Sequence, residues 1–181
     1  EKQKLAIAKS LATALAFVHE NKFIHRDLKP ENIMIDNNLN FYLIDFGIAK
    51  VVTGQDNAYT RAKGTVHYLA PETLDVAELT ESEEIVSAIT TQVDVWAYGC
   101  ILSYIFSEKL PWCNKYLDNS AVIQKLLIQK KEFPVPIDLV KKDKYSCADQ
   151  IIEIIRGCTV IDPKKRFTMK NVNEILSKIK I

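Results

Sequence analysis

Apolar residues recur at spacings of three and four along the first part of the chain. The positions are Leu5, Ala8, Leu11, Ala12, Leu15 and Val18. Because an α-helix turns once every 3.6 residues, this spacing places them on one face. The pattern predicts a helix over residues 5–19 whose apolar face is buried.

A second stretch, residues 94–107, is apolar on nearly every side, which is typical of a helix surrounded by other elements. Its apolar run from Val95 to Phe106 has 12 residues, whereas a helix that crosses a bilayer needs about 20. We therefore expect the central core helix here, and we expect Trp96 and Trp112 to be buried.

Three further helices are predicted near the C-terminus from capping residues followed by apolar positions. Asn119-Ser120 can cap a helix that carries residues 122–127, and Thr168 can cap one that buries Val172, Ile175, Leu176 and Ile179. Ser146 with Asp149 reads as a variant capping box ahead of residues 151–155.

Two short apolar runs, residues 33–35 and 41–44, flank the turn-forming residues 36–38 and predict a β-hairpin with a longer loop. The ends of a hairpin meet, so Asp27 and Asn32 before the first strand should lie close to Asp45 after the second. Carboxylate and amide oxygens are hard ligands that suit Mg²⁺. This stretch predicts metal-assisted chemistry on phosphate.

The composition of the 181 residues indicates one ordinary globular domain or one large piece of a domain, and the net charge of +1 implies no bulk attraction to nucleic acid or membrane. The four cysteines form no C-x-x-C pair, so we expect buried free thiols in a reducing compartment rather than disulfides or a metal site. No signal peptide is evident and the chain opens on Glu1, so we expect an intracellular fragment, in the cytoplasm or nucleus, of a longer protein.

Four motifs follow one another along the chain: His-Arg-Asp-Leu-Lys-Pro-Glu-Asn at 25–32, Asp-Phe-Gly at 45–47, Ala-Pro-Glu at 70–72 and Asp-Val-Trp-Ala-Tyr-Gly at 94–99. In this order they resemble the eukaryotic protein kinase family. The resemblance covers residues 1–181 but only the family's helical C-terminal lobe. It implies a mainly α fold with one small hairpin, an activation segment at 45–72 and an acidic insertion at about 75–90. The Gly-rich loop, the strand lysine and the helix glutamate of the family's N-terminal lobe are absent.

The resemblance also implies chemical roles. Asp27 would accept the proton of the substrate hydroxyl, and Lys29 would neutralise the transferring phosphoryl group. Asn32 and Asp45 would hold the Mg²⁺ ions that bridge the phosphates of ATP, and Thr65 would hydrogen-bond to Asp27 and Lys29. A lysine at position 29 is similar to Ser/Thr-specific rather than Tyr-specific kinases.

Other residues would be structural by the same resemblance. Met34 would form the floor under the adenine of ATP, and His25 and Phe46 would belong to the stacked column that links the lobes. Asp94 would accept hydrogen bonds from the backbone of the 25–32 loop. Glu72 and Arg166 would form a buried ion pair.

Regulation is implied by Arg26, which, with help from Lys50, would bind a phosphate on the activation segment. Thr60 is the first candidate for that phosphate, ahead of Tyr59 and Thr53, and the alternative is that all are ordinary polar loop residues. The long acidic connection and residues 43–49 are similar to the monopolar spindle group of dual-specificity kinases.

Three hypotheses follow. The chain is the C-terminal lobe of an ATP-dependent Ser/Thr protein kinase that acts on protein substrates and needs its missing N-terminal lobe for activity. Alternatively, it is a pseudokinase or scaffold lobe used for docking, although a scaffold has no chemical need for Asp27, Asn32 and Asp45 together. Third, the isolated lobe self-associates, either through an exposed apolar cleft floor near Ile24, Met34 and Phe46 or by exchange of the activation segment.

Overall fold

The computed structural model describes residues 1–36, 41–45, 50–51, 66–73, 90–112, 123 and 135–180, with the backbone alone for 50–51. Four predicted features lie outside these residues: the helix after Asn119-Ser120 except Ile123, the acidic insertion except Thr90, most of the activation segment, and Cys113.

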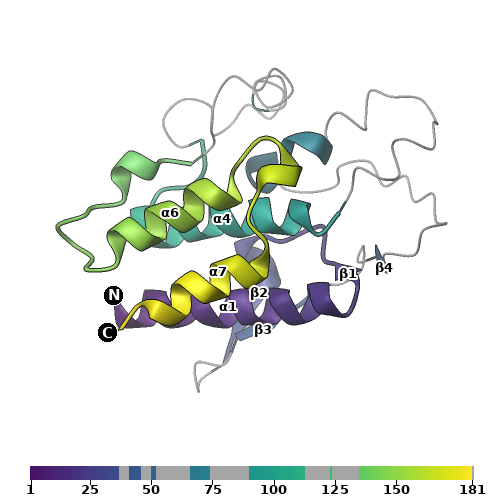
Figure 1. The fold of residues 1–181 in the computed structure, drawn as a ribbon, viewed down its shortest axis with the longest axis horizontal. Coiled ribbons are helices and arrows are strands. Elements are labelled where there is room, and N and C mark those ends of the chain that lie inside the picture. The colour runs from purple at the N-terminus through teal and green to yellow at the C-terminus, as the bar shows by residue number, and fades with distance from the viewer. Residues whose placement is uncertain are drawn as a thin grey trace.

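The described fold is mainly α-helical, as predicted (Figure 1). The α-helices whose bounds lie within the described residues are α1 (Lys2–Glu20), α4 (Gln92–Ser107), α6 (Ala148–Cys158) and α7 (Met169–Lys178). Four short 3₁₀ turns, η1 to η4, cover Pro30–Asn32, Val66–Tyr68, Ile137–Leu139 and Pro163–Lys165. None of the described helices is long and apolar enough to span a membrane.

Two small antiparallel sheets complete the described structure. Strands β2 (Ile33–Ile35) and β3 (Phe41–Leu43) form the predicted hairpin, with Ile33 opposite Leu43 and Met34 opposite Tyr42. Strands β1 (Phe23–Ile24) and β4 (Lys50–Val51) pair as a second ladder, with Ile24 opposite Lys50. This second ladder was not predicted.

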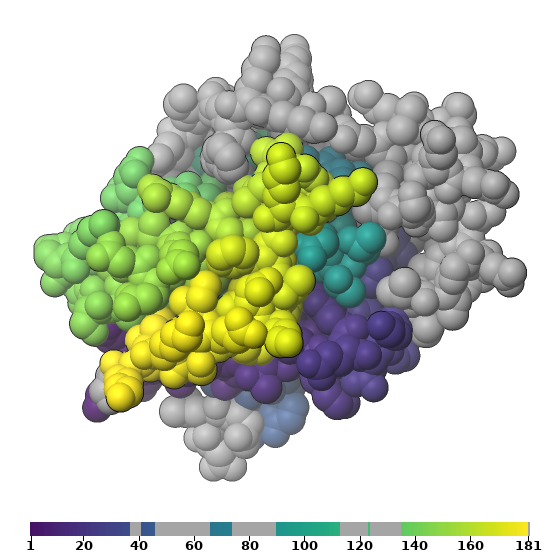
Figure 2. All heavy atoms as spheres, in the orientation of Figure 1, coloured from purple at the N-terminus to yellow at the C-terminus, as the bar shows by residue number. Residues whose placement is uncertain are grey.

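Helix α4 is the centre of the core. It packs against α6 and α1, and α1 lies alongside α7 (Figure 1). Only a small part of the teal α4 region is visible on the face in Figure 2. Trp96 and Trp112 are buried, as expected. A Cβ atom added at Gly99 would lie 2.7 Å from Cβ of Cys158, so only glycine lets α6 approach α4 this closely.

The N-terminal residues connect α1 to the start of α6. The Ser146 hydroxyl donates to the Glu1 carboxylate (2.8 Å), and the Cys147 amide donates to the same oxygen (3.2 Å). The predicted Ser146–Asp149 capping box is therefore wrong: the N-cap is Cys147, which makes no side-chain cap. Thr168 does cap α7, in a reciprocal box with Asn171.

The cysteine prediction is confirmed for the three described cysteines. Cys100, Cys147 and Cys158 are buried free thiols. Burial is the largest cause that raises the pKa of the Cys147 thiol, to about 11. These thiols are therefore protonated at neutral pH and behave as small apolar side chains.

Candidate active site

The loop of residues 25–32 lies between β1 and β2 and is held by the buried carboxylate of Asp94, in the first turn of α4. The backbone amide of His25 donates to Oδ2 of Asp94 and the amide of Arg26 donates to Oδ1, both at 2.8 Å. Arg26 has a left-handed φ of 70°, which is costly for a residue other than glycine. Asp94 thus anchors the loop in a strained conformation, and its predicted contacts are confirmed.

Asp27 lies in a cluster with Lys29 and Asn32. Nζ of Lys29 donates to Oδ2 of Asp27 (2.7 Å), and Nδ2 of Asn32 donates to the same oxygen (3.1 Å) and to the backbone carbonyl of Asp27 (2.8 Å). Oδ1 of Asp27 accepts no hydrogen bond from the described residues, so it is available to a further donor. The structure therefore brings three of the predicted site residues together.

The hairpin connects this cluster to Asp45. The amide of Ile44 donates to the carbonyl oxygen of Asn32 (3.0 Å), so Asp45 directly follows a residue bonded to Asn32. Asp45 is exposed and has a φ of 61°. The buried His25 ring is also fixed to this strand, because Nε2 donates to the carbonyl of Ile44 (3.0 Å).

These residues fit a magnesium ion. The side-chain nitrogen of Asn32 is occupied by Asp27, which leaves its amide oxygen to act as a ligand. With the Asp45 carboxylate it makes a pair of hard oxygen donors on adjacent strand ends, and Mg²⁺ takes its remaining ligands from water and phosphate.

The outward face of the hairpin is apolar. Met34 and Tyr42 lie opposite each other and are 55% and 51% exposed, so Met34 lies on a surface that could support a planar ligand. The prediction that Ile24 contributes to this exposed floor is wrong. Ile24 is 3% exposed because its strand pairs with β4 and its side chain joins the core.

The proposed phosphate-binding pair is described only in part. The β1–β4 ladder places the backbone of Lys50 opposite Ile24, two residues before Arg26. Burial, the larger cause, lowers the pKa of the Arg26 guanidinium, and the charge of Asp94 opposes this shift. Thr65, Phe46, Thr60, Tyr59, Thr53 and the Lys50 side chain lie outside the described residues.

The predicted ion pair between Glu72 and Arg166 is confirmed. Nη1 and Nη2 of Arg166 donate to the two carboxylate oxygens of Glu72 at 2.7 and 3.1 Å. The guanidinium also donates to the carbonyls of Gln92, Val160 and Ile161. This ion pair fixes the Ala-Pro-Glu segment to the start of α4 and to the loop before α7.

One residue near the site was missed by the sequence analysis. Nε2 of His19, at the end of α1, lies 2.9 Å from Oδ2 of Asp94. The apolar spacing that predicts α1 says nothing about a polar residue in its last turn. The partner Asp94 is 75 residues away, so no local pattern could have found the contact.

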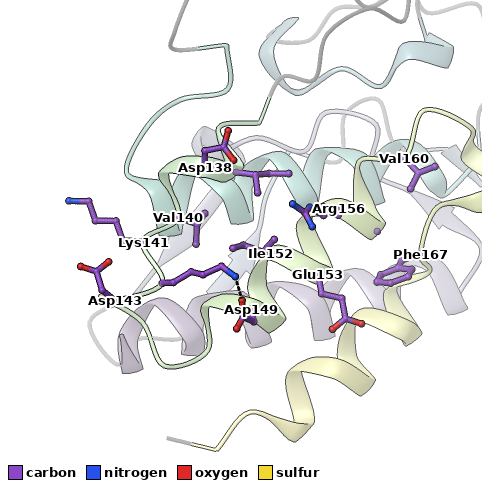
Figure 3. Close-up of a pocket in the computed structure, with 13 residues that line it drawn as sticks. Asp138, Val140, Lys141, Asp143, Asp149, Ile152, Glu153, Arg156, Val160 and Phe167 are labelled. Carbon is purple, nitrogen blue, oxygen red and sulfur yellow. Dashed lines mark ion pairs between the residues drawn. The ribbon is translucent and has the colours of Figure 1, made fainter.

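A groove of about 860 Å³ lies elsewhere, between α6, residues 137–143 and Phe167 (Figure 3). It is lined by charges of both signs, including Asp138, Lys141, Glu153 and Arg156. Neither the 25–32 loop nor Asp45 contributes to its lining. The groove is therefore separate from the candidate active site.

Comparison with known proteins identifies the class. The family model described as the protein kinase domain matches residues 1–176. The chain belongs to the protein kinase domain family.

Three relatives show the range of this similarity. Serine/threonine-protein kinase cds1 of Schizosaccharomyces pombe is 30% identical over 90% of this chain and 33% of that protein. The probable LRR receptor-like serine/threonine-protein kinase RPK1 of Arabidopsis thaliana is 30% identical over 96% of this chain and 32% of that protein. The 3-phosphoinositide-dependent protein kinase B of Dictyostelium discoideum is 35% identical over 91% of this chain and 16% of that protein. The chain thus spans a third or less of these relatives, which give no support to the similarity with the monopolar spindle group.

Proposed function

We propose that residues 1–181 form the C-terminal lobe of an ATP-dependent protein kinase that phosphorylates Ser and Thr hydroxyls of protein substrates. One observation carries the proposal: Oδ2 of Asp27 accepts hydrogen bonds from both Lys29 and Asn32, and Asn32 is bonded to the residue before Asp45. In this proposal Asp27 is the base, Lys29 the cation, and Asn32 and Asp45 the metal ligands of one site.

The chemistry follows from the charges of these residues. Oδ1 of Asp27, which accepts no hydrogen bond from the described residues, accepts the proton of the substrate hydroxyl as the hydroxyl oxygen attacks the γ-phosphorus of ATP and ADP leaves. Lys29 orients the carboxylate of Asp27 and offers positive charge to the transferring phosphoryl group. Asn32 and Asp45 would hold Mg²⁺, which supplies neutralisation of the phosphates of ATP when bound. In this proposal Thr65 hydrogen-bonds to Asp27 and Lys29, and Met34 lies under the adenine.

Control of the site is also part of the proposal. Residues 45–72 are the activation segment, and residues 75–90 are an acidic insertion. A phosphate on Thr60 would be bound by Arg26 and Lys50, because a partly buried guanidinium attracts an anion more strongly than a hydrated one. We place the protein inside the cell, in the cytoplasm or nucleus.

The test compares the full polypeptide that carries this chain with residues 1–181 alone, using Mg²⁺, labelled ATP and a mixed protein substrate. We expect label on Ser and Thr from the full polypeptide and none from the isolated chain, which lacks the family's nucleotide-binding N-terminal lobe. Nucleotide binding by neither protein would favour the scaffold alternative. Label on Tyr alone would contradict the Ser/Thr assignment.

We further propose that isolated residues 1–181 self-associate in solution. The exposed pair of Met34 and Tyr42 supports this, because exposed apolar surface favours association. We expect light scattering to give a mass that increases with concentration, and a Met34→Glu, Tyr42→Glu double variant to remain monomeric. A monomeric mass for the parent chain at every concentration would contradict the proposal.

A further inference from the structure

The groove between α6 and residues 137–143 has an apolar floor (Figure 3). The apolar lining consists of Ile137, Ile152, Val160 and Phe167. The position of Phe167 is fixed on α6, because its amide donates to the carbonyl of Gly157 (2.9 Å) and a Cβ atom added at Gly157 would clash with its ring. The floor is therefore formed before any ligand arrives, as is usual for binding sites.

Most charged side chains around this floor are unpaired within the part of the chain that the structure describes. One ion pair, between Lys142 and Asp149, joins two lining residues. The other charged lining residues are exposed and make no ion pair or side-chain hydrogen bond with any described residue; they are Asp138, Lys141, Asp143, Glu153 and Arg156.

The spacing of Glu153 and Arg156 on α6 permits an ion pair, because residues three apart are neighbours on a helix. Figure 3 shows instead that the ends of these two side chains point away from each other. Both charges are therefore available to a ligand in the groove.

The available charges place one cation between two acids. In Figure 3 the guanidinium of Arg156 lies between the carboxylates of Asp138 and Glu153. Lys141 and Asp143 both lie at one end of the groove, where their opposite charges offset each other. The pattern that remains across the floor is acid, cation, acid.

This pattern defines the chemistry of the ligand. A guanidinium is weakly hydrated and binds a carboxylate through two parallel hydrogen bonds, so Arg156 favours an acidic group. The flanking carboxylates of Asp138 and Glu153 would repel a polyanion such as a nucleic acid backbone or an anionic lipid surface. They favour instead a ligand that carries basic groups on both sides of its acid.

The size of the groove favours a peptide. Its volume of about 860 Å³ is large for a ligand pocket, since such pockets usually measure about 300 to 1,000 Å³. Several side chains fit into this space, and arginine beside apolar surface is common at the centre of protein interfaces.

We propose that this groove binds a short segment of a partner protein in which one acidic residue lies between basic residues and next to a large aliphatic residue. The acid binds Arg156, the basic residues meet Asp138 and Glu153, and the aliphatic side chain packs on Ile152 and Phe167. The groove is separate from the candidate active site, so this binding does not depend on phosphoryl transfer.

The test selects binders from a displayed library of random short peptides, with the full polypeptide that carries this chain as bait. We expect the enriched peptides to share an acidic residue between basic residues, with an aliphatic neighbour. Fluorescence anisotropy then measures the affinity of one labelled, enriched peptide. Arg156→Glu should weaken its binding by about 10-fold or more, the effect of losing a hydrogen bond between charged groups.

A charge exchange shows where the peptide binds. Replacing the acidic residue of the peptide with lysine should weaken binding to the parent and restore binding to Arg156→Glu. Glu153→Lys, a second exposed position on α6, should also weaken binding of the original peptide. Lys164→Glu is the matched control: it makes the same change in net charge as Arg156→Glu at an exposed residue of η4 that does not line the groove, so it should alter neither affinity.

Thermal unfolding first establishes that each variant is folded. The proposal is overturned if no peptide is enriched, if the enriched peptides lack the expected charges, or if the parent and Arg156→Glu bind them equally. A parent dimer that Arg156→Glu dissociates would show that a second copy of the chain occupies the groove, and this result would also overturn the proposal.

Discussion

Replacing Asp27 with asparagine in the full polypeptide is expected to lower kcat for phosphoryl transfer by about 10²-fold to 10⁴-fold, the usual contribution of a general base. Asparagine has nearly the same shape, but its amide oxygen does not take a proton at neutral pH. Asp27 also holds Lys29 at 2.7 Å, and this charge-assisted bond is lost with the carboxylate. Binding of ATP should change little, because Asp27 is not among the proposed metal ligands.

The measurement is the initial rate of label transfer at saturating ATP and substrate, together with thermal unfolding. Asp143→Asn serves as the matched control because Asp143 is exposed and lines the groove away from the active site. Equal rates for the parent and Asp27→Asn would remove Asp27 as the base. A large fall in melting temperature would instead assign Asp27 a structural role.

Replacing Arg166 with methionine is expected to destabilise the fold by about 3 to 5 kcal/mol, because it leaves the Glu72 carboxylate buried without its cation. The Arg166 side chain is 0% exposed and that of Glu72 is 10% exposed. The Cζ atom of Arg166 also lies 5.0 Å from the centroid of the Trp96 ring. The guanidinium donates hydrogen bonds to three backbone carbonyl groups. Lysine restores the positive charge but not the fork of donors that reaches the three carbonyls, so Arg166→Lys should recover only part of the loss.

Urea unfolding of the variants measures this effect. Arg156→Met is the control because Arg156 is an exposed arginine on α6, and its loss should change the free energy of unfolding by less than about 1 kcal/mol. A loss below about 1 kcal/mol for Arg166→Met would show that Glu72 becomes hydrated or protonated at little cost.

The helices were predictable where burial follows local spacing. The positions Leu5, Ala8, Leu11, Ala12 and Leu15 are the buried face of α1, and α4 is buried on most sides, as its apolar composition indicates. The hairpin was predictable because its strands are adjacent in sequence. Asp27, Asn32 and Asp45 could be placed together for the same reason.

The remaining features depend on partners that are distant in sequence. Strands β1 and β4 have two residues each and are separated by the hairpin, so neither gives a periodic signal. Their pairing buries Ile24, which local sequence could not reveal. Serine is a residue type that often caps helices, but the hydroxyl of Ser146 donates instead to the carboxylate of Glu1, 145 positions away. The contact between His19 and Asp94 likewise exists only in the folded chain.

The burial of α4 has a consequence for synthesis of the protein on the ribosome. Tyr98 of α4 bonds to Ala8 of α1, which is already made, but α6 begins only at residue 148. About 40 residues separate the two helices. Because translation proceeds at about 5 to 20 residues per second, roughly 2 to 8 s pass between the synthesis of α4 and that of its main packing partner, α6. During that interval the apolar surface of α4 that α6 will bury stays uncovered, which favours aggregation with other nascent chains.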